Sequence, residues 1–144
     1  MELQETTAMK LLALMPFVHE KIIHPMGQIT RSKLSGIQFW ALNILSKRGS
    51  QTMSELAEHM KIAKQQLTPV VDRLIEQKCV VRSADPQDRR VVRIDITEDG
   101  QRMMDVLKKE SRDALILKVK NLTESEQLEL NSAVDKVREI LEKL

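Results

Sequence analysis

The chain has 144 residues, of which 42% are hydrophobic and 31% are charged, with only four glycines and four prolines. This length suggests one domain, and the composition indicates a folded, mostly helical chain rather than a disordered one. The single cysteine excludes an intrachain disulfide and a multi-cysteine zinc site, and no apolar run reaches the ~18 residues of a transmembrane helix. The acidic start is unlike a secretory signal, so we expect a cytoplasmic protein with no membrane partner.

The net charge of +2 is too small to indicate a nucleic-acid partner, but the charges are unevenly distributed. Residues 61–97 carry eight Lys and Arg against five Asp and Glu, whereas residues 98–144 carry nine against eleven. A local positive excess is an expected feature of a nucleic-acid-binding surface, although a few charges are weak evidence alone.

Residues 8–24 carry apolar side chains at helical spacing on more than one side, which predicts a helix that packs between other helices. The main apolar line comprises Leu11, Met15, Val18, Ile22 and Met26. Pro16 removes a backbone donor, so a kink or a new helix start is expected there. Pro25 is expected to end the helix at Ile23 or His24.

Two helix starts follow, each with a capping box in which a hydroxyl residue precedes Glu or Gln by three positions. The first box runs from Ser35 to Gln38, and the second from Thr52 to Glu55. Residues expected inside the first helix are Ile37, Ala41, Ile44 and Leu45, with Phe39 and Trp40 also in the core. Those expected inside the second are Leu56, Ala57 and Met60.

A third helix is predicted from about Ala63 to Gln77, with one apolar stripe and a polar opposite face. The stripe comprises Leu67, Val70, Val71, Leu74 and Ile75. The first turn offers a cation, two amides and a hydroxyl, from Lys64, Gln65, Gln66 and Thr68. Such groups bind phosphates and base edges, and Gln pairs bidentately with adenine. A polar outer face is usually only solvated, but this helix is the second of a pair and precedes a basic hairpin, which favours DNA binding.

Residues 79–96 predict a β-hairpin. A strand from Cys79 to Ser83 is followed by the turn sequence DPQD and by an alternating strand from Val91 to Ile96. Arg89 and Arg90 lie at or near the tip. A narrow minor groove concentrates negative potential that inserted Arg side chains exploit, so the hairpin is a candidate for minor-groove binding.

Two long helices complete the chain. Thr97 is expected to cap the first, which runs to about Lys120, and Thr123 to Glu126 is a third capping box. The last helix repeats apolar residues at alternating spacings of four and three, at Leu130, Val134, Val137, Leu141 and Leu144. Together with the apolar N-terminal helix, this pattern favours a helical interface made from both chain ends.

The order of these parts resembles the MarR family of bacterial transcription regulators. The resemblance is carried by MSELAEHM (53–60), VVDRLIEQKCVVR (70–82) and DPQDRRVVRIDITEDG (85–100), in the middle third of the chain. It implies a mainly α winged helix–turn–helix fold with a small antiparallel β-hairpin, in a single domain of residues 1–144. Residues 34–100 would bind DNA, and residues 1–28 and 101–144 would form a helical dimerisation part. A homodimer would bind a pseudo-palindromic operator, mostly as a repressor.

The resemblance also implies roles for individual residues. The helix from Ala63 to Gln77 would be the recognition helix, and Arg89 and Arg90 would belong to the wing. The DNA-binding residues would be Thr52, Ser54, Lys64, Gln65, Gln66, Thr68, Arg73, Arg89 and Arg90. Asp72 and Arg90 match a pair expected to bridge the helix and the wing.

The chain departs from the family pattern in three places. Gln65 and Gln66 replace a usual Ser/Thr pair, Pro69 stands where a basic residue is frequent, and Cys79 stands where Gly is usual. Pro69 is expected to bend the helix or, together with Thr68, to cap a new helix start. Cys79 is expected to be a small buried hydrophobic residue.

A regulator of this kind is expected to respond to an apolar or aromatic small-molecule effector bound between its helical and winged parts. Candidate ligand-binding residues are Phe17, His19 and Trp40, and no cofactor is expected. The effector must bind two states differently if it is to change the spacing of the recognition helices.

Alternatives from other classes remain open. Catalysis is disfavoured because the chain has no Tyr, no glycine-rich phosphate loop and no nucleophile with an evident His partner. A metal-responsive regulator of the same fold would use Glu20 and His24, but zinc needs three or four ligands. A protein-interaction module without DNA binding would show no salt-dependent affinity for duplex DNA.

Overall fold

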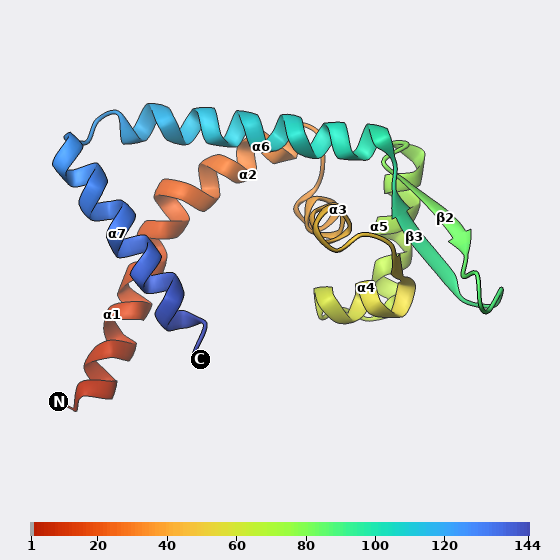
Figure 1. Cartoon of the computed structure of the whole chain (residues 1–144), viewed down its shortest axis with the longest axis horizontal. Helices are drawn as coiled ribbons and strands as arrows, with labels where there is room; N and C mark the ends of the chain where they lie inside the picture. The colour runs from red at the N-terminus through yellow and green to blue at the C-terminus, as the bar shows by residue number, and fades with distance from the viewer. Residues whose placement is uncertain (1) are drawn as a thin grey trace. The chain divides into compact units, whose positions relative to one another are not determined.

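The computed structural model describes residues 2–144 as a mainly helical chain with one small antiparallel sheet (Figure 1). The elements in chain order are α1 Leu3–Val18, the π-helical turn η1 His19–Ile23, α2 His24–Arg31, α3 Gly36–Arg48, β1 Gln51–Thr52, α4 Met53–Met60, α5 Lys64–Glu76, β2 Val80–Ala84, β3 Val92–Ile96, α6 Glu98–Val119 and α7 Glu124–Leu141. The chain divides into two compact units with a boundary after Lys109. Within residues 2–144, no helix is both long enough and apolar enough to cross a bilayer.

The helix predicted to end before Pro25 continues instead through η1 into α2, so that prediction is wrong. In the π-helical turn the His24 amide donates to the His19 carbonyl, five residues back. A proline ring clashes with the carbonyl four residues before it in an α-helix, and the wider π turn next to Pro25 relieves that crowding. Pro16 lies inside α1, which is one α-helix across it, so Pro16 marks no new start.

The hydrophobic core belongs to the winged part of the first unit. It comprises Leu34, Ala41, Leu42, Ile44, Leu45, Leu56, Ala57, Met60, Leu67, Val70, Val71, Leu74, Cys79, Val80, Ile94, Met104 and Leu107. The stripes predicted for α4 and α5 are therefore confirmed, with Ile75 packed at the edge of the core. Burial of Cys79, at 1% exposure, is confirmed as well.

Two predictions for α3 are wrong. Trp40 is 44% exposed and Ile37 is also exposed, whereas Leu42 is fully buried. Consecutive helical residues differ by about 100° in direction, so Trp40 points well away from its neighbour Ala41 on the buried side. Ile37 lies in the first turn of α3 and is not among the residues packed against the core. Phe39 does pack against the core.

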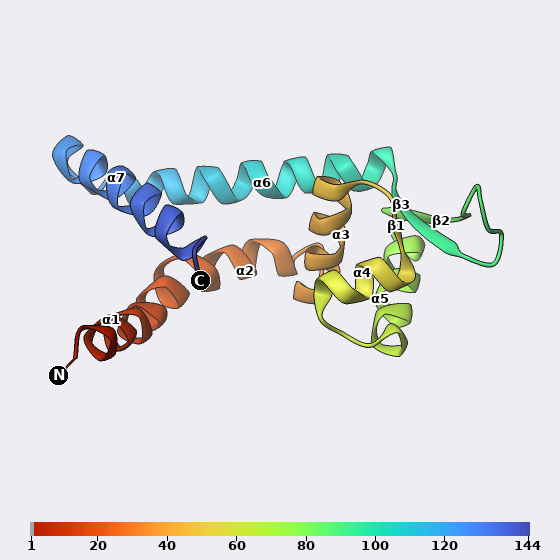
Figure 2. The ribbon, with the colours of Figure 1, turned by 60° about the horizontal axis from the view of Figure 1, so that its bottom comes forward.

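The sheet has three antiparallel strands in the order β1–β3–β2. Along the hairpin, Val80 pairs with Ile96 and Ala84 with Val92, while Gln51 of β1 pairs with Ile94. The two-residue strand β1 was not predicted, because Thr52 is at the same time the N-cap of α4. Figure 2 shows the hairpin extending away from α3, α4 and α5.

All three predicted capping boxes are confirmed. Thr52 accepts from the Glu55 amide and Thr123 from the Glu126 amide, and in each case the glutamate side chain accepts from the cap amide in return. Ser35 and Gln38 form the same reciprocal pair. Thr97 accepts from the Gly100 amide at 3.0 Å, as predicted, and so fixes the start of α6 beside the wing.

Candidate nucleic-acid interface

The helix pair α4–α5 is joined by a short turn that sets the start of α5. Lys61 ends α4 in the left-handed conformation, with φ of 53°. The N-cap of α5 is Ala63, which has no side chain able to accept a hydrogen bond. The side-chain oxygen of Gln66 accepts from the Ala63 amide at 3.1 Å and so satisfies one free donor at this helix start.

The outer face of α5 is solvent-exposed, as predicted. Lys64, Gln65, Gln66, Thr68 and Pro69 are all exposed. The Thr68 hydroxyl donates to the Lys64 carbonyl at 3.1 Å. α5 is one helix from Lys64 to Glu76, so the idea that Thr68 and Pro69 cap a new start is wrong. Pro69 has no amide hydrogen, so the Gln65 carbonyl lacks its usual intrahelical donor.

The wing turn is shaped by two aspartates. Asp85 accepts from the backbone amides of Gln87 at 2.9 Å and Asp88 at 3.2 Å. Asp88 in turn accepts from the amide of Arg90 at 3.0 Å and from its guanidinium at 3.2 Å. These bonds hold the backbone of the tip, while the Arg90 side chain remains 91% exposed.

The pKa of Asp85 is lowered, first by the Gln87 amide and then by the hydrogen bond from Arg93. Asp85 therefore stays ionised as a fixed acceptor for the turn. Burial raises the pKa of the Cys79 thiol, and Asp99 adds to this effect. A neutral, buried thiol is a packing group and not a reactive one.

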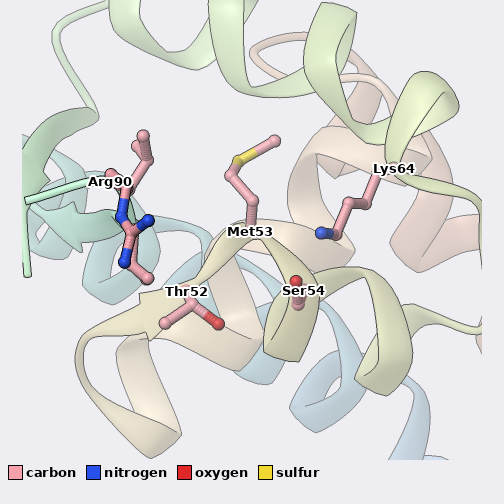
Figure 3. A pocket seen from close by; sticks show the side chains of 7 residues that line it. Thr52, Met53, Ser54, Lys64 and Arg90 are labelled. Carbon is pink, nitrogen blue, oxygen red and sulfur yellow. The ribbon is translucent and has the colours of Figure 1, made fainter. Parts of the chain in front are cut away.

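A cleft of about 260 Å³ lies where the helix pair meets the wing. It is lined by Thr52, Met53, Ser54, Lys64, Arg90, Val91 and Val92. Figure 3 shows Lys64 and Arg90 on either side of Met53, beside the start of α4. Two cations and two hydroxyls, from β1, α4, α5 and the wing loop, thus share one opening, which is the chemistry that binds a phosphate of a nucleic-acid backbone.

Four of the nine residues predicted to bind DNA line this cleft: Thr52, Ser54, Lys64 and Arg90. Gln65, Gln66 and Thr68 follow Lys64 along the first turns of α5. Arg73 lies further along α5 and pairs with Glu76 at 3.6 Å, and Arg89 is exposed in the wing loop. Neither Arg73 nor Arg89 is among the cleft residues.

The predicted bridge between α5 and the wing has a different arginine. The Asp72 carboxylate accepts from Arg82 of β2 at 2.6 Å, whereas Arg90 is bonded to Asp88. The pairing of Asp72 with Arg90 is therefore corrected to Asp72 with Arg82. The physical reason is proximity along the chain: β2 follows α5 directly, while Arg90 is held at the tip by its own turn.

Sequence reasoning also missed the partners of Arg93. Its guanidinium donates to Ser50 and to Asp85, although the alternating pattern of the strand only puts Arg93 on the face opposite its apolar residues. The available signal was an aspartate at the start of the turn and an arginine on the returning strand, which a hairpin brings together. Ser50, 43 residues away, gave no signal in the sequence.

The candidate ligand residues are spread over three elements. Phe17 of α1 is 64% exposed, His19 lies in η1 with its ring 6.3 Å from that of His24, and Trp40 is on α3. None of the three lines the cleft. Among residues 2–144, no group of three or more His, Cys, Asp or Glu side chains is placed to hold a metal ion.

Parts of this chain match known proteins in sequence and in fold. The sequence model of the MarR family matches residues 25–92. The HTH-type regulator YpoP of Bacillus subtilis, itself uncharacterised, is 29% identical over 124 residues, which are 84% of this chain and 88% of YpoP. The repressor MdtR of the same organism is 35% identical over 63 residues, or 44% of this chain and 41% of MdtR.

Solved structures show the same fold. A MarR family protein from Bacillus stearothermophilus superposes with a TM-score of 0.80 at 24% identity, over 95% of this chain and 96% of that one. Wild-type MarR from E. coli, in its apo form, gives 0.76 at 25% identity, over 88% and 95%. Both structures share the winged-helix fold of this chain. Just under half of the chain, residues 25–92, thus matches the MarR family model, and the curated relatives are named as HTH-type transcriptional regulators or repressors.

Proposed function

We propose that this regulator is a ligand-responsive repressor that binds a pseudo-palindromic operator as a homodimer. The observation that carries the proposal is the cleft in which Lys64 of α5 and Arg90 of the wing converge with Thr52 and Ser54. A backbone phosphate held there would fix α5 in the major groove and the wing on the adjacent minor groove. The exposed Arg89 and Arg90 would then face the narrow groove.

A second copy of the chain is the partner that we propose for the terminal helices. Neither α1 nor α7 buries a side chain among the described residues, although both carry large apolar ones. Exposed apolar surface of this kind marks an interaction site. The proposed division assigns residues 34–100 to DNA binding and residues 1–28 and 101–144 to dimerisation. Two recognition helices about 34–36 Å apart would then enter successive major grooves.

The proposal also includes repression and its release by an effector. MdtR, a shorter match to this chain, is named as a repressor. An apolar or aromatic effector near Phe17, His19 and Trp40 would change the distance between the two recognition helices. Phe17 and Trp40 offer exposed aromatic surface for such a ligand. The effector acts only to the extent that it binds one spacing more tightly than the other.

The test is a salt titration of binding to the duplex upstream of the protein's own gene, measured by fluorescence anisotropy. Each phosphate contact contributes about 0.9 to the slope of log affinity against log salt. Lys64→Ala removes one contact per protomer, so a dimer should lose about 1.8 from the slope. Arg90→Ala should reduce the slope in the same way.

The matched control is Lys120→Ala, which removes the same charge in the turn between α6 and α7. Its slope should equal that of the wild type. The proposal fails if the wild-type protein shows no salt-dependent affinity for duplex DNA. It also fails if Lys64→Ala and Arg90→Ala have the same slope as Lys120→Ala.

A further inference from the structure

The first turn of α5 presents two neighbouring glutamines to solvent, and their side chains are in different hydrogen-bonding states. A glutamine that reads adenine uses both ends of its amide: the oxygen accepts from N6 and the nitrogen donates to N7. A residue with this role therefore needs both atoms free before DNA arrives. The two glutamines differ in whether they meet this requirement.

Gln66 is already engaged. Its side-chain oxygen accepts from the Ala63 amide, at 3.1 Å, and Ala63 has no side chain that could replace it. Turning Gln66 toward a base would leave that amide unbonded at the start of the helix. Thr68 is also engaged, because its hydroxyl hydrogen is donated to the Lys64 carbonyl.

Gln65 is free. Its side chain makes no hydrogen bond or ion pair with any part of the chain between residues 2 and 144. It is exposed, and it is the second residue of α5, close to the helix end that enters the groove.

Helical phase places Gln65 on the line farthest from the core. With about 100° between consecutive residues, Gln65 lies roughly 170° from the mean direction of Leu67, Val70, Val71 and Leu74, and Gln66 only about 90° from it. The four reference residues are all buried. Pro69, one turn further on the same line, has neither an amide hydrogen nor a polar side chain to compete for the base edge.

We propose that Gln65 determines operator specificity by reading an adenine in the major groove of each half-site, and that Gln66 is a positioning residue that holds the start of the recognition helix. This inference rests on the proposed DNA-binding function and adds to it a named base and a named side chain. It predicts one A·T pair in each half-site whose identity depends on Gln65 alone.

The experiment uses the full chain and a duplex selected by the wild-type protein from a randomised library. Every pair in each half-site is replaced in turn by the other three, and affinities are measured for the wild type, Gln65→Ala and Gln66→Ala. A bidentate pair gives about 5- to 150-fold discrimination, so the wild type should prefer A·T by this factor at one position per half-site. Gln65→Ala should bind all four pairs there with nearly equal affinity.

Gln66→Ala is the matched control, since it deletes the same side chain one residue away. It should keep the A·T preference while its affinity for every duplex falls by a common factor. Replacing the critical adenine by 7-deazaadenine removes the N7 acceptor. This should weaken the wild type and leave Gln65→Ala unchanged, as expected when the two changes delete one shared contact.

The inference is overturned if Gln65→Ala retains the preference, or if Gln66→Ala is the variant that loses it. In both cases salt-dependent binding to the selected duplex persists, so the proposed function stands. Absence of any selected sequence or of salt-dependent binding by the wild type would overturn the proposed function and this inference together.

Discussion

The guanidinium of Arg93 on β3 lies 3.0 Å from the carboxylate of Asp85, at the opposite side of the wing turn. The same guanidinium donates to the hydroxyl of Ser50 at 2.9 Å and to its carbonyl at 3.1 Å. Both partners of the ion pair are largely shielded, with side-chain exposures of 25% and 19%. Arg93 therefore ties the wing turn to the residue that precedes β1.

We expect Arg93→Ala to weaken operator binding without changing its salt dependence. Arg93 does not line the cleft, and its guanidinium is bonded to Asp85 and Ser50, so we expect it to hold the wing in place and not to contact a phosphate. Arg90→Ala is the informative comparison, because it should lower both the affinity and the salt slope. If Arg93→Ala flattens the slope as strongly as Arg90→Ala does, Arg93 is a direct DNA contact and not a positioning residue.

Acid should destabilise the wing because it protonates the Asp85 carboxylate. Its pKa is lowered in the folded protein, chiefly by the Gln87 amide and next by Arg93. A lowered pKa means that the ionised carboxylate stabilises the fold above its unfolded pKa of about 3.9, and that this stability is lost as the pH falls through the folded value. Between pH 6 and pH 3, the melting temperature should therefore fall less for Asp85→Asn than for the wild type. Asp135→Asn, on exposed α7, is the control and should match the wild type.

The bridge between Asp72 and Arg82 should be worth little for stability. Its side chains are 51% and 39% exposed, and exposed ion pairs contribute at most about 1 kcal/mol. A double-mutant cycle with Asp72→Ala and Arg82→Ala should give a coupling free energy of unfolding below about 1 kcal/mol. The parallel cycle of Asp72 with Arg90 should give none. Coupling to Arg90 but not to Arg82 would show that the wing adopts a different arrangement in solution.

Gly100 should not tolerate a side chain. A Cβ atom there would lie 2.1 Å from the Cys79 carbonyl oxygen, which also accepts from the Thr97 amide. Gly100→Ala must push α6 away from the start of β2, and overpacking of this kind costs about 1–3 kcal/mol or more. Gly36→Ala is the control, since a Cβ atom there would meet nothing within 4 Å. Chemical denaturation should show a clear loss in the free energy of unfolding for Gly100→Ala and none for Gly36→Ala.

Local signals in the sequence predicted most of the elements. Each capping box acts over three residues, so Ser35, Thr52 and Thr123 mark helix starts without any knowledge of the fold. The stripe of α5 is equally local, because a 3.6-residue period is visible in the chain itself. The continuation of the first helix past Pro25 was not predictable in this way, since it depends on a π turn for which the sequence carries no local signal.

Long-range partners account for what the sequence could not predict at the site. Arg93 looks like a surface residue of an alternating strand until Ser50 is brought beside it by the pairing of β1 with β3. The exchange of Arg90 for Arg82 as the partner of Asp72 has a different origin, because β2 follows α5 directly while Arg90 is bonded to Asp88 in its own turn. The DNA contacts of Lys64 and Arg90 stay predictions, supported by their common cleft.

Dimerisation through α7 gives the last prediction. Leu130, Val134, Val137 and Leu141 repeat at spacings of four and three and are each at least 43% exposed in the single chain. Val134→Glu places a charge in the middle of this line, and burying an unpaired charge in an apolar interface is strongly unfavourable. The variant should be monomeric at concentrations where the wild type is dimeric, as measured by sedimentation equilibrium. It should also bind the operator more weakly, because the two half-sites are no longer engaged together. Ser132→Glu adds the same charge about 160° around the helix and should stay dimeric. A wild-type chain that is monomeric at micromolar concentration would exclude this interface.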